Sequence, residues 1–209
     1  MSEQEPQSER FSEGDEAPAR KRPRPGERRL QILQTLAAML EHPGAERVTT
    51  ASLAAKIGVS EAALYRHFAS KAQRFEGLID FVDQSVIGLI RQVTDREPAG
   101  PVQASRIVAL LLQFAEKNPG MSRVMIGDAL VLEHERLQER INLLFDKVEA
   151  QLRQSLRDAN AASNTPTLDT QVQASLLVAF MQGRLQRFAR SGFKRLPSEH
   201  LQAALARVL

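Results

Sequence analysis

The sequence contains no cysteine and no tryptophan, and Tyr65 is its only tyrosine. Without cysteine, the chain cannot form a disulfide framework, a zinc site with thiolate ligands or a thiol nucleophile. It also lacks any apolar run near the roughly 20 residues that span a bilayer, and its first residues lack the apolar core of a signal peptide. We therefore expect a soluble cytoplasmic protein without a membrane partner.

Runs in which Val, Ile or Thr alternate with polar residues, as they do in strands, are scarce as well. Leucine and alanine dominate instead, and most Pro and Gly residues lie at the edges of periodic stretches. This composition predicts an all-α fold. With 209 residues, of which 43% are hydrophobic, the chain can bury the core of one larger domain or of two small ones.

The formal net charge is only +3, but the charges are unevenly distributed. Between Glu3 and Glu16 six acidic residues face Arg10 alone, whereas between Arg20 and Arg29 six basic residues face only Glu27. Prolines at positions 18, 23 and 25, together with few apolar residues, predict a disordered bipolar tail over residues 1–26. Its basic half is either a solubilising segment or an arm that binds the nucleic-acid backbone.

Three short helices are predicted after this tail. The first begins at Glu27 and ends at Pro43 and Gly44, and the second covers about residues 50–57, with Thr49 or Thr50 as its N-cap. Gly58 ends the second helix, and Ser60 caps the third, which we expect to carry Phe68. The inward side chains predicted for the first helix are Leu30, Leu33, Leu36, Ala37 and Leu40.

Longer helices are predicted after Ser70. They cover the apolar repeat from Phe75 to Val93, then residues 102–117, a short helix over 121–126, a stripe from Leu130 to Leu156, and residues 168–190. The predicted breaks are 97-EPAGP-101, 118-NPG-120 and a polar loop over 159–167, and a short helix begins at Ser198. The apolar face of the last long helix is expected to hold Val172, Leu176, Leu177, Phe180 and Phe188.

Two short helices joined by a glycine turn are the parts of a helix-turn-helix, whose second helix enters the DNA major groove. Gly58 would supply the turn, and Leu64 and Phe68 would anchor the second helix. The residues that remain outside are Ser60, Glu61, Ala62, Ala63, Tyr65, Arg66, His67 and Lys71. Ordinary packing of short helices also produces such a pair, but between Arg47 and Arg74 every charged residue except Glu61 is basic, which favours DNA.

The outward residues suit different parts of DNA. Small side chains such as Ala62 and Ala63 let the helix approach the groove and can contact a thymine methyl group. Arg66 is the best candidate for a bidentate hydrogen bond with guanine. Thr50, Ser60, Tyr65, His67 and Lys71 suit phosphate oxygens.

The run 49-TTASLAAKIGVSEAALYRHFASK-71 resembles the helix-turn-helix of TetR-family regulators, with its Leu-Tyr-x-His-Phe segment followed by a lysine. The resemblance implies a DNA-binding domain over residues 27–72, joined by a long helix to a helical domain over 73–209 that forms a homodimer through its last two long helices. It also implies phosphate contacts by Thr50, Tyr65, His67 and Lys71. The complete candidate DNA interface is Thr49, Thr50, Ser60, Glu61, Ala62, Ala63, Tyr65, Arg66, His67 and Lys71.

The segments 58–71, 116–124 and 137–157 are similar to one branch of this family, the nucleoid occlusion factors, although the N-terminal tail is longer here. That branch binds palindromic sites in double-stranded chromosomal DNA, with several dimers on some sites, and blocks assembly of the division protein FtsZ over the nucleoid. The resemblance implies the same partners and a nucleoid location. The candidate partner contacts are Phe81, Lys117 and Asn118, although Phe81 also fits a core position and Asn118 a helix cap.

Three other functions compete with this interpretation. A ligand-responsive repressor needs an apolar cavity, whereas Phe114, Phe145, Phe180 and Phe188 fit core packing better. An enzyme is not indicated, because there is no nucleophile elbow or phosphate loop, and Glu133, His134 and Glu135 point in different directions on a helix. A structural helical protein would have no use for the residues around Tyr65. We expect neither a metal nor a cofactor.

Overall fold

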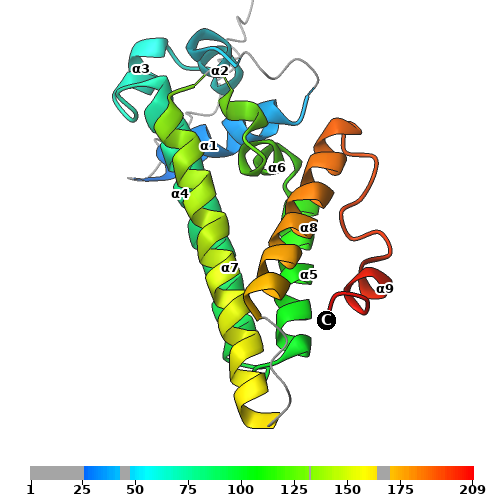
Figure 1. Ribbon diagram of the computed structural model, residues 1–209. Coiled ribbons are helices and arrows are strands. Elements are labelled where there is room, and N and C mark those ends of the chain that lie inside the picture. Colours follow the sequence, from blue (N-terminus) through cyan, green and yellow to red (C-terminus); the bar gives the residue numbers. More distant parts are fainter. Residues whose placement is uncertain (1–25, 43–47, 132, 164–169) are drawn as a thin grey trace, which may run out of the picture.

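Figure 1 shows the computed structural model, which describes residues 26–42, 48–131, 133–163 and 170–209. Throughout these ranges the regular structure is helical and contains no strand, which confirms the all-α prediction. The tail predicted for residues 1–26 lies outside the described residues up to position 25. The elements are α1 (Glu27–Leu40), α2 (Thr50–Ile57), α3 (Glu61–Tyr65), α4 (Lys71–Thr94), α5 (Pro101–Lys117), α6 (Pro119–Met125), η2 (Asp128–Leu130), α7 (Glu135–Ser163), α8 (Thr170–Arg190) and α9 (Leu201–Leu205).

The first three helices surround the first turns of α4, at the top of Figure 1. Helices of eight and five residues, such as α2 and α3, are too short to be stable alone. They are held because their apolar side chains enter the same core as the start of α4. The buried residues in this part are Ile32, Leu36, Leu40, Leu53, Ala54, Leu64, Phe68, Phe75 and Leu78.

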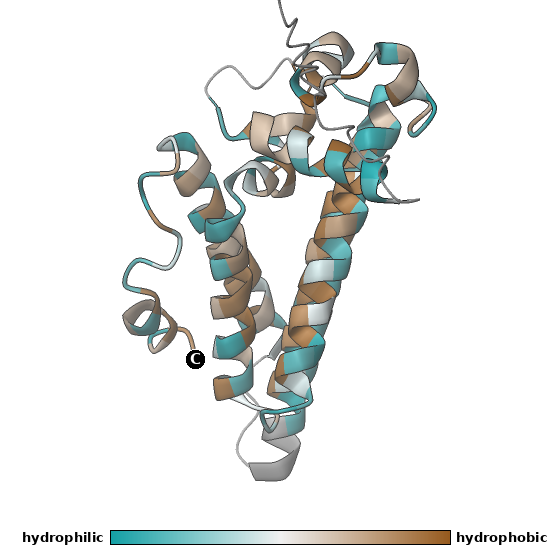
Figure 2. Cartoon of the chain, turned by 180° about the vertical axis from the view of Figure 1, so that it is seen from behind, coloured by the Kyte–Doolittle hydropathy of each residue, from teal (hydrophilic) through white to brown (hydrophobic). Residues whose placement is uncertain are grey.

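The remaining long helices form a bundle in which α4 and α7 run side by side in the same direction, while α5 and α8 run back (Figure 1). Brown and teal alternate along the long helices in Figure 2, as expected for helices that bury one stripe. On α4 this stripe includes Leu78, Val82 and Val86, and on α7 it includes Leu144 and Val148. One continuous core therefore joins the N-terminal end of α4 to the C-terminal bundle.

A row of ion pairs follows the seam between α4 and α7. The Arg136 guanidinium lies 2.7 Å from the Glu76 carboxylate, Arg140 pairs with Asp80, and Lys147 Nζ lies 2.8 Å from Asp83. Each pair is partly exposed and contributes little to stability by itself, about 0–1 kcal/mol. Together they fix the register of α4 against α7.

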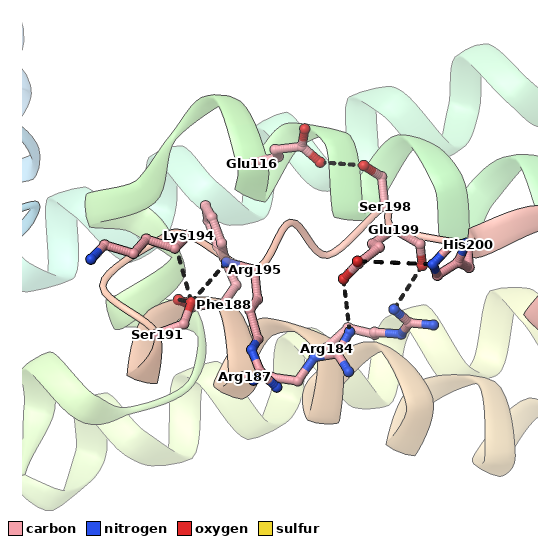
Figure 3. A network of polar contacts seen from close by, with 10 residues as sticks. All are labelled: Glu116, Arg184, Arg187, Phe188, Ser191, Lys194, Arg195, Ser198, Glu199 and His200. Atoms are coloured by element: carbon pink, nitrogen blue, oxygen red, sulfur yellow. Dashed lines mark hydrogen bonds and ion pairs between the residues drawn. The ribbon is translucent and has the colours of Figure 1, made fainter.

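The chain after α8 returns along α8 and α5 and is tied to both by the polar contacts drawn in Figure 3. Ser191 Oγ accepts hydrogen bonds from the backbone N–H groups of Lys194 and Arg195, at 3.1 and 2.9 Å. Further along, Ser198 Oγ donates to Glu116 Oε2 on α5 at 2.6 Å, and Arg184 Nη1 donates to the Glu199 carbonyl at 2.8 Å. These contacts hold α9 against the outside of the bundle.

Several details of the predicted helices were wrong. In α1 the inward stripe starts at Ile32, which is fully buried, whereas Leu30 is 46% exposed. Pro119 and Gly120 do not merely end a helix, because Pro119 is the first residue of α6. Helix α7 continues to Ser163 instead of ending before a loop at 159, since Ala159, Ala161 and Ala162 favour a helix. Other differences were α8 beginning at Thr170, and α9 at Leu201 after a turn from Ser198; Pro43 and Gly44 lie outside the described residues.

The apolar face predicted for the last long helix was also partly wrong. Leu177 and Phe188 are buried as expected, but Val172 and Leu176 are about half exposed, at 51% and 54%. Their inward places are taken by Ala174, Val178, Met181 and Leu185. On the neighbouring helix α7, Leu143 is 57% exposed. The pair α7 and α8 thus carries apolar side chains on its outer side as well as in the core.

Gly120 allows α6 to approach α1 closely, and this contact yields a prediction for stability. A Cβ at position 120 would overlap the carbonyl oxygen of Ala37. We expect Gly120→Ala to lower the free energy of unfolding by about 1–3 kcal/mol or more, the usual cost of overpacking. Urea unfolding at one fixed protein concentration measures it.

Gly88→Ala is the matched control, because Gly88 is also helical and a Cβ there meets nothing within 4 Å. It should raise the free energy of unfolding by up to about 1 kcal/mol through helix propensity. Equal effects of the two substitutions would contradict the close contact between α1 and α6.

Candidate DNA interface

Side-chain caps define where each helix of the helix-turn-helix begins. Thr49 Oγ1 accepts from the Ser52 N–H at 3.1 Å, and the Ser52 hydroxyl accepts from the Thr49 N–H at 3.0 Å, which is a capping box. Ser60 Oγ accepts from the Ala63 N–H at 3.2 Å and starts α3. Two predicted N-caps are confirmed. Thr49, one of the two candidates, caps α2, and Ser60 caps α3.

The turn between α2 and α3 depends on Gly58. This residue has φ 75°, a left-handed conformation that favours glycine, and its N–H donates to the Ala54 carbonyl at 2.9 Å. The Val59 N–H donates to the same carbonyl at 3.0 Å. Leu64 and Phe68, at 0% and 1% exposure, then anchor α3 and the turn after it in the core.

Helix α3 is shorter than predicted and ends at Tyr65. Arg66 and His67 therefore lie in the turn that follows α3, and buried Phe68 lies beyond the helix as well. The turn is held by Arg29 of α1, whose Nη1 donates to the His67 carbonyl at 2.9 Å and whose guanidinium stacks 4.1 Å from the centre of the Phe68 ring. Sequence reasoning had assigned Arg29 only to a basic arm.

Most of the candidate DNA contacts lie on the accessible side of α2, α3 and the following turn (Figure 1). Tyr65 is 48% exposed. The exposed candidates are Thr49, Ser60, Glu61, Ala62, Tyr65, Arg66 and His67, and the half-buried ones are Thr50, Ala63 and Lys71. The fold brings these residues to one end of the molecule, although Ala63 is less outward than predicted.

Lys71 already has a partner, because its Nζ lies 2.5 Å from Glu133 Oε1, just before α7. Its side chain also passes 5.8 Å from the centre of the Phe75 ring. An ion pair with a carboxylate satisfies the same ammonium group that a DNA phosphate would bind. If Lys71 binds a phosphate, as predicted from the sequence, Glu133 would compete with that phosphate.

Arg74 was missed by the sequence analysis except as the end of a basic stretch. It is 1% exposed, its Nη2 donates to Thr50 Oγ1 at 2.6 Å, and its guanidinium lies 5.9 Å from the centre of the Tyr65 ring. Burial lowers the pKa of Arg74, while Tyr65, Glu133 and Glu61 act in the opposite direction. Arg74 lies beside Phe75 and four residues before Leu78, on the buried stripe of α4. This position was the signal in the sequence that could have indicated its burial.

The candidate partner contacts lie apart from the DNA face. Phe81 is 38% exposed on α4, and Lys117 is exposed at the end of α5. Asn118 Nδ2 donates to the Phe114 carbonyl at 2.7 Å, so this side chain does cap α5. Asn118 is therefore the weakest of the three candidates.

A groove of about 580 Å³ lies between α4 and α5. Leu89, Gln92 and Arg96 line it on the α4 side, and Arg106, Leu110 and Gln113 line it on the α5 side. Lys117 follows Gln113 by one helical turn and therefore lies at the end of this groove, although it does not line it. Phe81 lies outside the lining and points about 80° away from Leu89 around α4.

Two further findings concern the part of the chain that the structure describes. Among these residues, no group of three or more His, Asp or Glu side chains could hold a metal ion, and no helix is long and apolar enough to cross a membrane. His134 Nδ1 accepts from the Arg136 N–H at 3.3 Å at the start of α7, while neighbouring Glu133 pairs with Lys71. Glu133 and His134 thus make two separate contacts, one with Lys71 and one with the start of α7.

Two family models match the chain. Residues 32–78 match the bacterial regulatory proteins of the tetR family, and residues 101–207 match the SlmA-like tetracyclin repressor-like C-terminal domain. The nucleoid occlusion factor SlmA of Idiomarina loihiensis is 50% identical over 177 residues, which is 84% of this chain and 90% of that protein. SlmA of Shewanella woodyi is 48% identical over 176 residues, covering 84% and 89%.

Solved structures share the fold at much lower identity. The regulator PfmR from Thermus thermophilus aligns with a TM-score of 0.70 and 20% identity, over 86% of this chain and 97% of PfmR. FadR from Bacillus subtilis, in complex with stearoyl-CoA, also aligns with a TM-score of 0.70, at 13% identity over 86% of this chain and 96% of FadR. At such identities the likeness concerns the fold alone.

The ion pair between Lys71 and Glu133 yields a prediction for DNA binding. We expect Glu133→Gln to bind DNA about two- to fivefold more tightly at low salt, because it frees Lys71 and removes a negative charge near the phosphates. Fluorescence anisotropy with a labelled duplex measures the change.

Glu139→Gln removes the same charge from an exposed position further along α7, and should leave the affinity unchanged. Weaker or unchanged binding by a folded Glu133→Gln protein would show that Glu133 does not compete with DNA.

Proposed function

Because this chain belongs to the TetR family, and within it to the nucleoid occlusion factors named SlmA, we propose that its homodimer binds palindromic chromosomal sites and from there blocks FtsZ assembly. The protein is a DNA-binding regulator of this family and not an enzyme. The match over residues 101–207 carries this proposal, because the helix-turn-helix is common to regulators of many kinds.

DNA binding is supported by the geometry of the α2–α3 unit. The caps at Thr49 and Ser60 and the turn at Gly58 fix two short helices, and α3 presents its start to the outside. Arg66, in the turn after α3, is exposed and has no ion-pair partner among the described residues, so its guanidinium is available for a base or a phosphate. This arrangement suits entry of α3 into a major groove.

A homodimer explains the exposed apolar side chains of α7 and α8. Leu143 on α7 and Leu176 on α8 are more than half exposed, although both helices bury another stripe in the core. Burial of such residues against a second copy gives a self-complementary interface with two-fold symmetry. Two symmetric helix-turn-helix units then require a palindromic site.

The groove between α4 and α5 is the surface we propose for FtsZ. Apolar Leu89 and Leu110 lie beside Arg96, whereas Arg106 pairs with Glu97, which lines the groove too, at 3.9 Å. Exposed Lys117 lies one helical turn beyond Gln113, at the end of the lining. A segment with both apolar and acidic side chains would complement these walls. The groove faces away from α2 and α3, at the other part of α4, so DNA and a partner can be bound together.

A ligand-responsive repressor is the alternative function, as the complex of FadR with stearoyl-CoA illustrates for that protein. The phenylalanines of the C-terminal domain give it little support. Phe145 and Phe188 are 4% and 1% exposed, and no phenylalanine lines the groove between α4 and α5 or the hollows beside Met125, Gly127 and Gly183. They act as core residues.

Two substitutions separate phosphate contacts from base contacts. We expect Lys71→Ala to weaken binding to every DNA sequence and to reduce the slope of log K against log salt by about 1, because one phosphate contact is lost. Arg66→Ala should weaken binding to the palindrome by about 1–3 kcal/mol and change binding to unrelated DNA much less. Titrations at several salt concentrations measure both effects.

Unchanged binding by both variants would remove the proposed DNA interface. Arg91→Ala is a suitable control, because Arg91 is an exposed arginine of α4 that lies twenty residues beyond Lys71 along the helix.

Co-sedimentation of FtsZ polymers tests the second half of the proposal. We expect the protein to reduce the pelleted FtsZ when its DNA site is present, and less so without DNA. Lys117→Glu should weaken this effect, because it reverses a charge at the end of the groove. Arg91→Glu makes the same charge change outside the groove lining and should act like the unmodified protein.

No effect on FtsZ, with or without DNA, from a protein that binds its palindrome would contradict FtsZ as the partner. The DNA-binding proposal would then stand alone, and a repressor would be the better description.

A further inference from the structure

A buried arginine lies directly beneath two of the candidate phosphate contacts. Arg74 of α4 donates from Nη2 to Thr50 Oγ1 of α2 at 2.6 Å, and its guanidinium lies 5.9 Å from the centre of the Tyr65 ring of α3. One side chain therefore touches both helices of the helix-turn-helix. At 1% exposure it does not reach the surface itself.

The hydrogen bond from Arg74 determines what the Thr50 hydroxyl can do. A threonine hydroxyl has one hydrogen to donate and two lone pairs to accept with. Since the guanidinium, which has only donors, occupies a lone pair, the hydroxyl hydrogen must point elsewhere. Donation by a cation also polarises the hydroxyl and strengthens its own hydrogen bond to a further acceptor.

Thr50 lies at a position where a hydroxyl donor can reach an anion outside the protein. It is the first residue of α2 and is half exposed, and its side chain stands among backbone N–H groups that have no partner within the helix. The positive end of the helix dipole also favours an anion there. A phosphate oxygen can accept the hydroxyl hydrogen and also carries the negative charge that this positive potential favours.

The charge of Arg74 is not neutralised by a close carboxylate. Among the ion pairs of the described residues none includes Arg74, and Glu133, one of the acids that raise its pKa, is held by Lys71. The Nη1 atom of Arg74 is buried and has no hydrogen-bond partner in the described part of the chain. The positive charge of the Arg74 guanidinium therefore lies just under the candidate DNA face, in a site of low dielectric where its field is strong.

We propose that Arg74 is a positioning residue of the DNA interface, which directs the Thr50 hydroxyl at a DNA phosphate without touching DNA. This inference rests on the proposed DNA binding. It goes beyond it by assigning a role to a residue outside the contact surface. A purely structural link between α2 and α4 would leave the phosphate contact of a folded variant unchanged.

Binding to duplexes with single methylphosphonate substitutions tests the proposal, because each substitution removes the charge of one phosphate. For the unmodified protein, one position in each half-site should report the Thr50 contact by a loss of about tenfold, the size expected for a hydrogen bond to a charged group. We expect Arg74→Met to bind the normal duplex about tenfold more weakly and to lose the sensitivity at that position only.

Thr50→Val should give the same pattern while leaving Arg74 in place, which keeps the proposal testable if Arg74→Met fails to fold. The double variant should bind no more weakly than the weaker single variant, because both changes remove one contact. Arg74→Lys, which keeps a charge and a donor, should recover part of the sensitivity. Arg91→Met is the matched control on the same helix and should bind like the unmodified protein.

Two outcomes would overturn the inference: full methylphosphonate sensitivity in folded Arg74→Met, or additive losses in the double variant. Failure of the unmodified protein to bind any DNA would instead contradict the proposed function. The two failures are therefore distinguishable.

Discussion

The packing of two short helices against α1 and the first turns of α4 is the contact on which the candidate DNA-binding face depends. With eight and five residues, α2 and α3 cannot persist alone, and they are fixed by Leu53 and Leu64 in the core around Phe75. The start of α4 is itself set by Ser70, whose Oγ accepts from the Gln73 N–H at 3.1 Å. The N-terminus of α4 and the packing of α1 together thus set where the candidate DNA contacts lie.

The same helix is bound along its length to α7, and the order of charges across this seam has a consequence for DNA. Glu76, Asp80 and Asp83 are acidic residues of α4 that face basic residues of α7. At the DNA end the order is reversed, because α4 supplies Lys71 and the segment before α7 supplies Glu133. Without this reversal, α4 would place a carboxylate where a phosphate must bind. The reversal lets one row of ion pairs hold the seam and still offer a cation at its end.

Local signals in the sequence were sufficient for much of the fold. Thr49, Ser60 and Ser70 act as caps through contacts within three residues of each, and Gly58 adopts a left-handed turn, so short-range chemistry predicted these boundaries. Long-range contacts were not predictable in this way. Ile32 replaces Leu30 in the core because the direction of the neighbouring helices decides the inward face, and Leu176 is exposed because an apolar stripe can serve either a core or an interface.

The site shows the same division between local and long-range information. The exposed set around Tyr65 follows from the spacing of its anchors Leu64 and Phe68, whereas the early end of α3 follows from the docking of Arg29 on the next turn. Arg74 and Glu133 act through contacts that span 24 and 62 residues of sequence, with Thr50 and Lys71 respectively. The pattern of neighbouring residues in the sequence does not predict such long-range pairs. Arg74 was therefore interpreted as part of a basic surface stretch, although it is buried.

The position of the groove limits how DNA can act on a partner. Leu89 lies 18 residues after Lys71 on one continuous helix, which is about 27 Å at 1.5 Å per residue. Between them α4 buries one stripe, from Phe75 through Leu78 and Val82 to Val86, and is tied to α7 by ion pairs. A helix packed in this way transmits a rigid movement more readily than a local change of shape. DNA could change the shape of the groove only if the protein had two conformations and DNA bound one of them with higher affinity. The ion pair that DNA can replace in this row lies at the far end, between Lys71 and Glu133. The arrangement therefore favours a groove that exists without DNA, with the DNA site gathering several dimers so that FtsZ polymers meet many grooves at once.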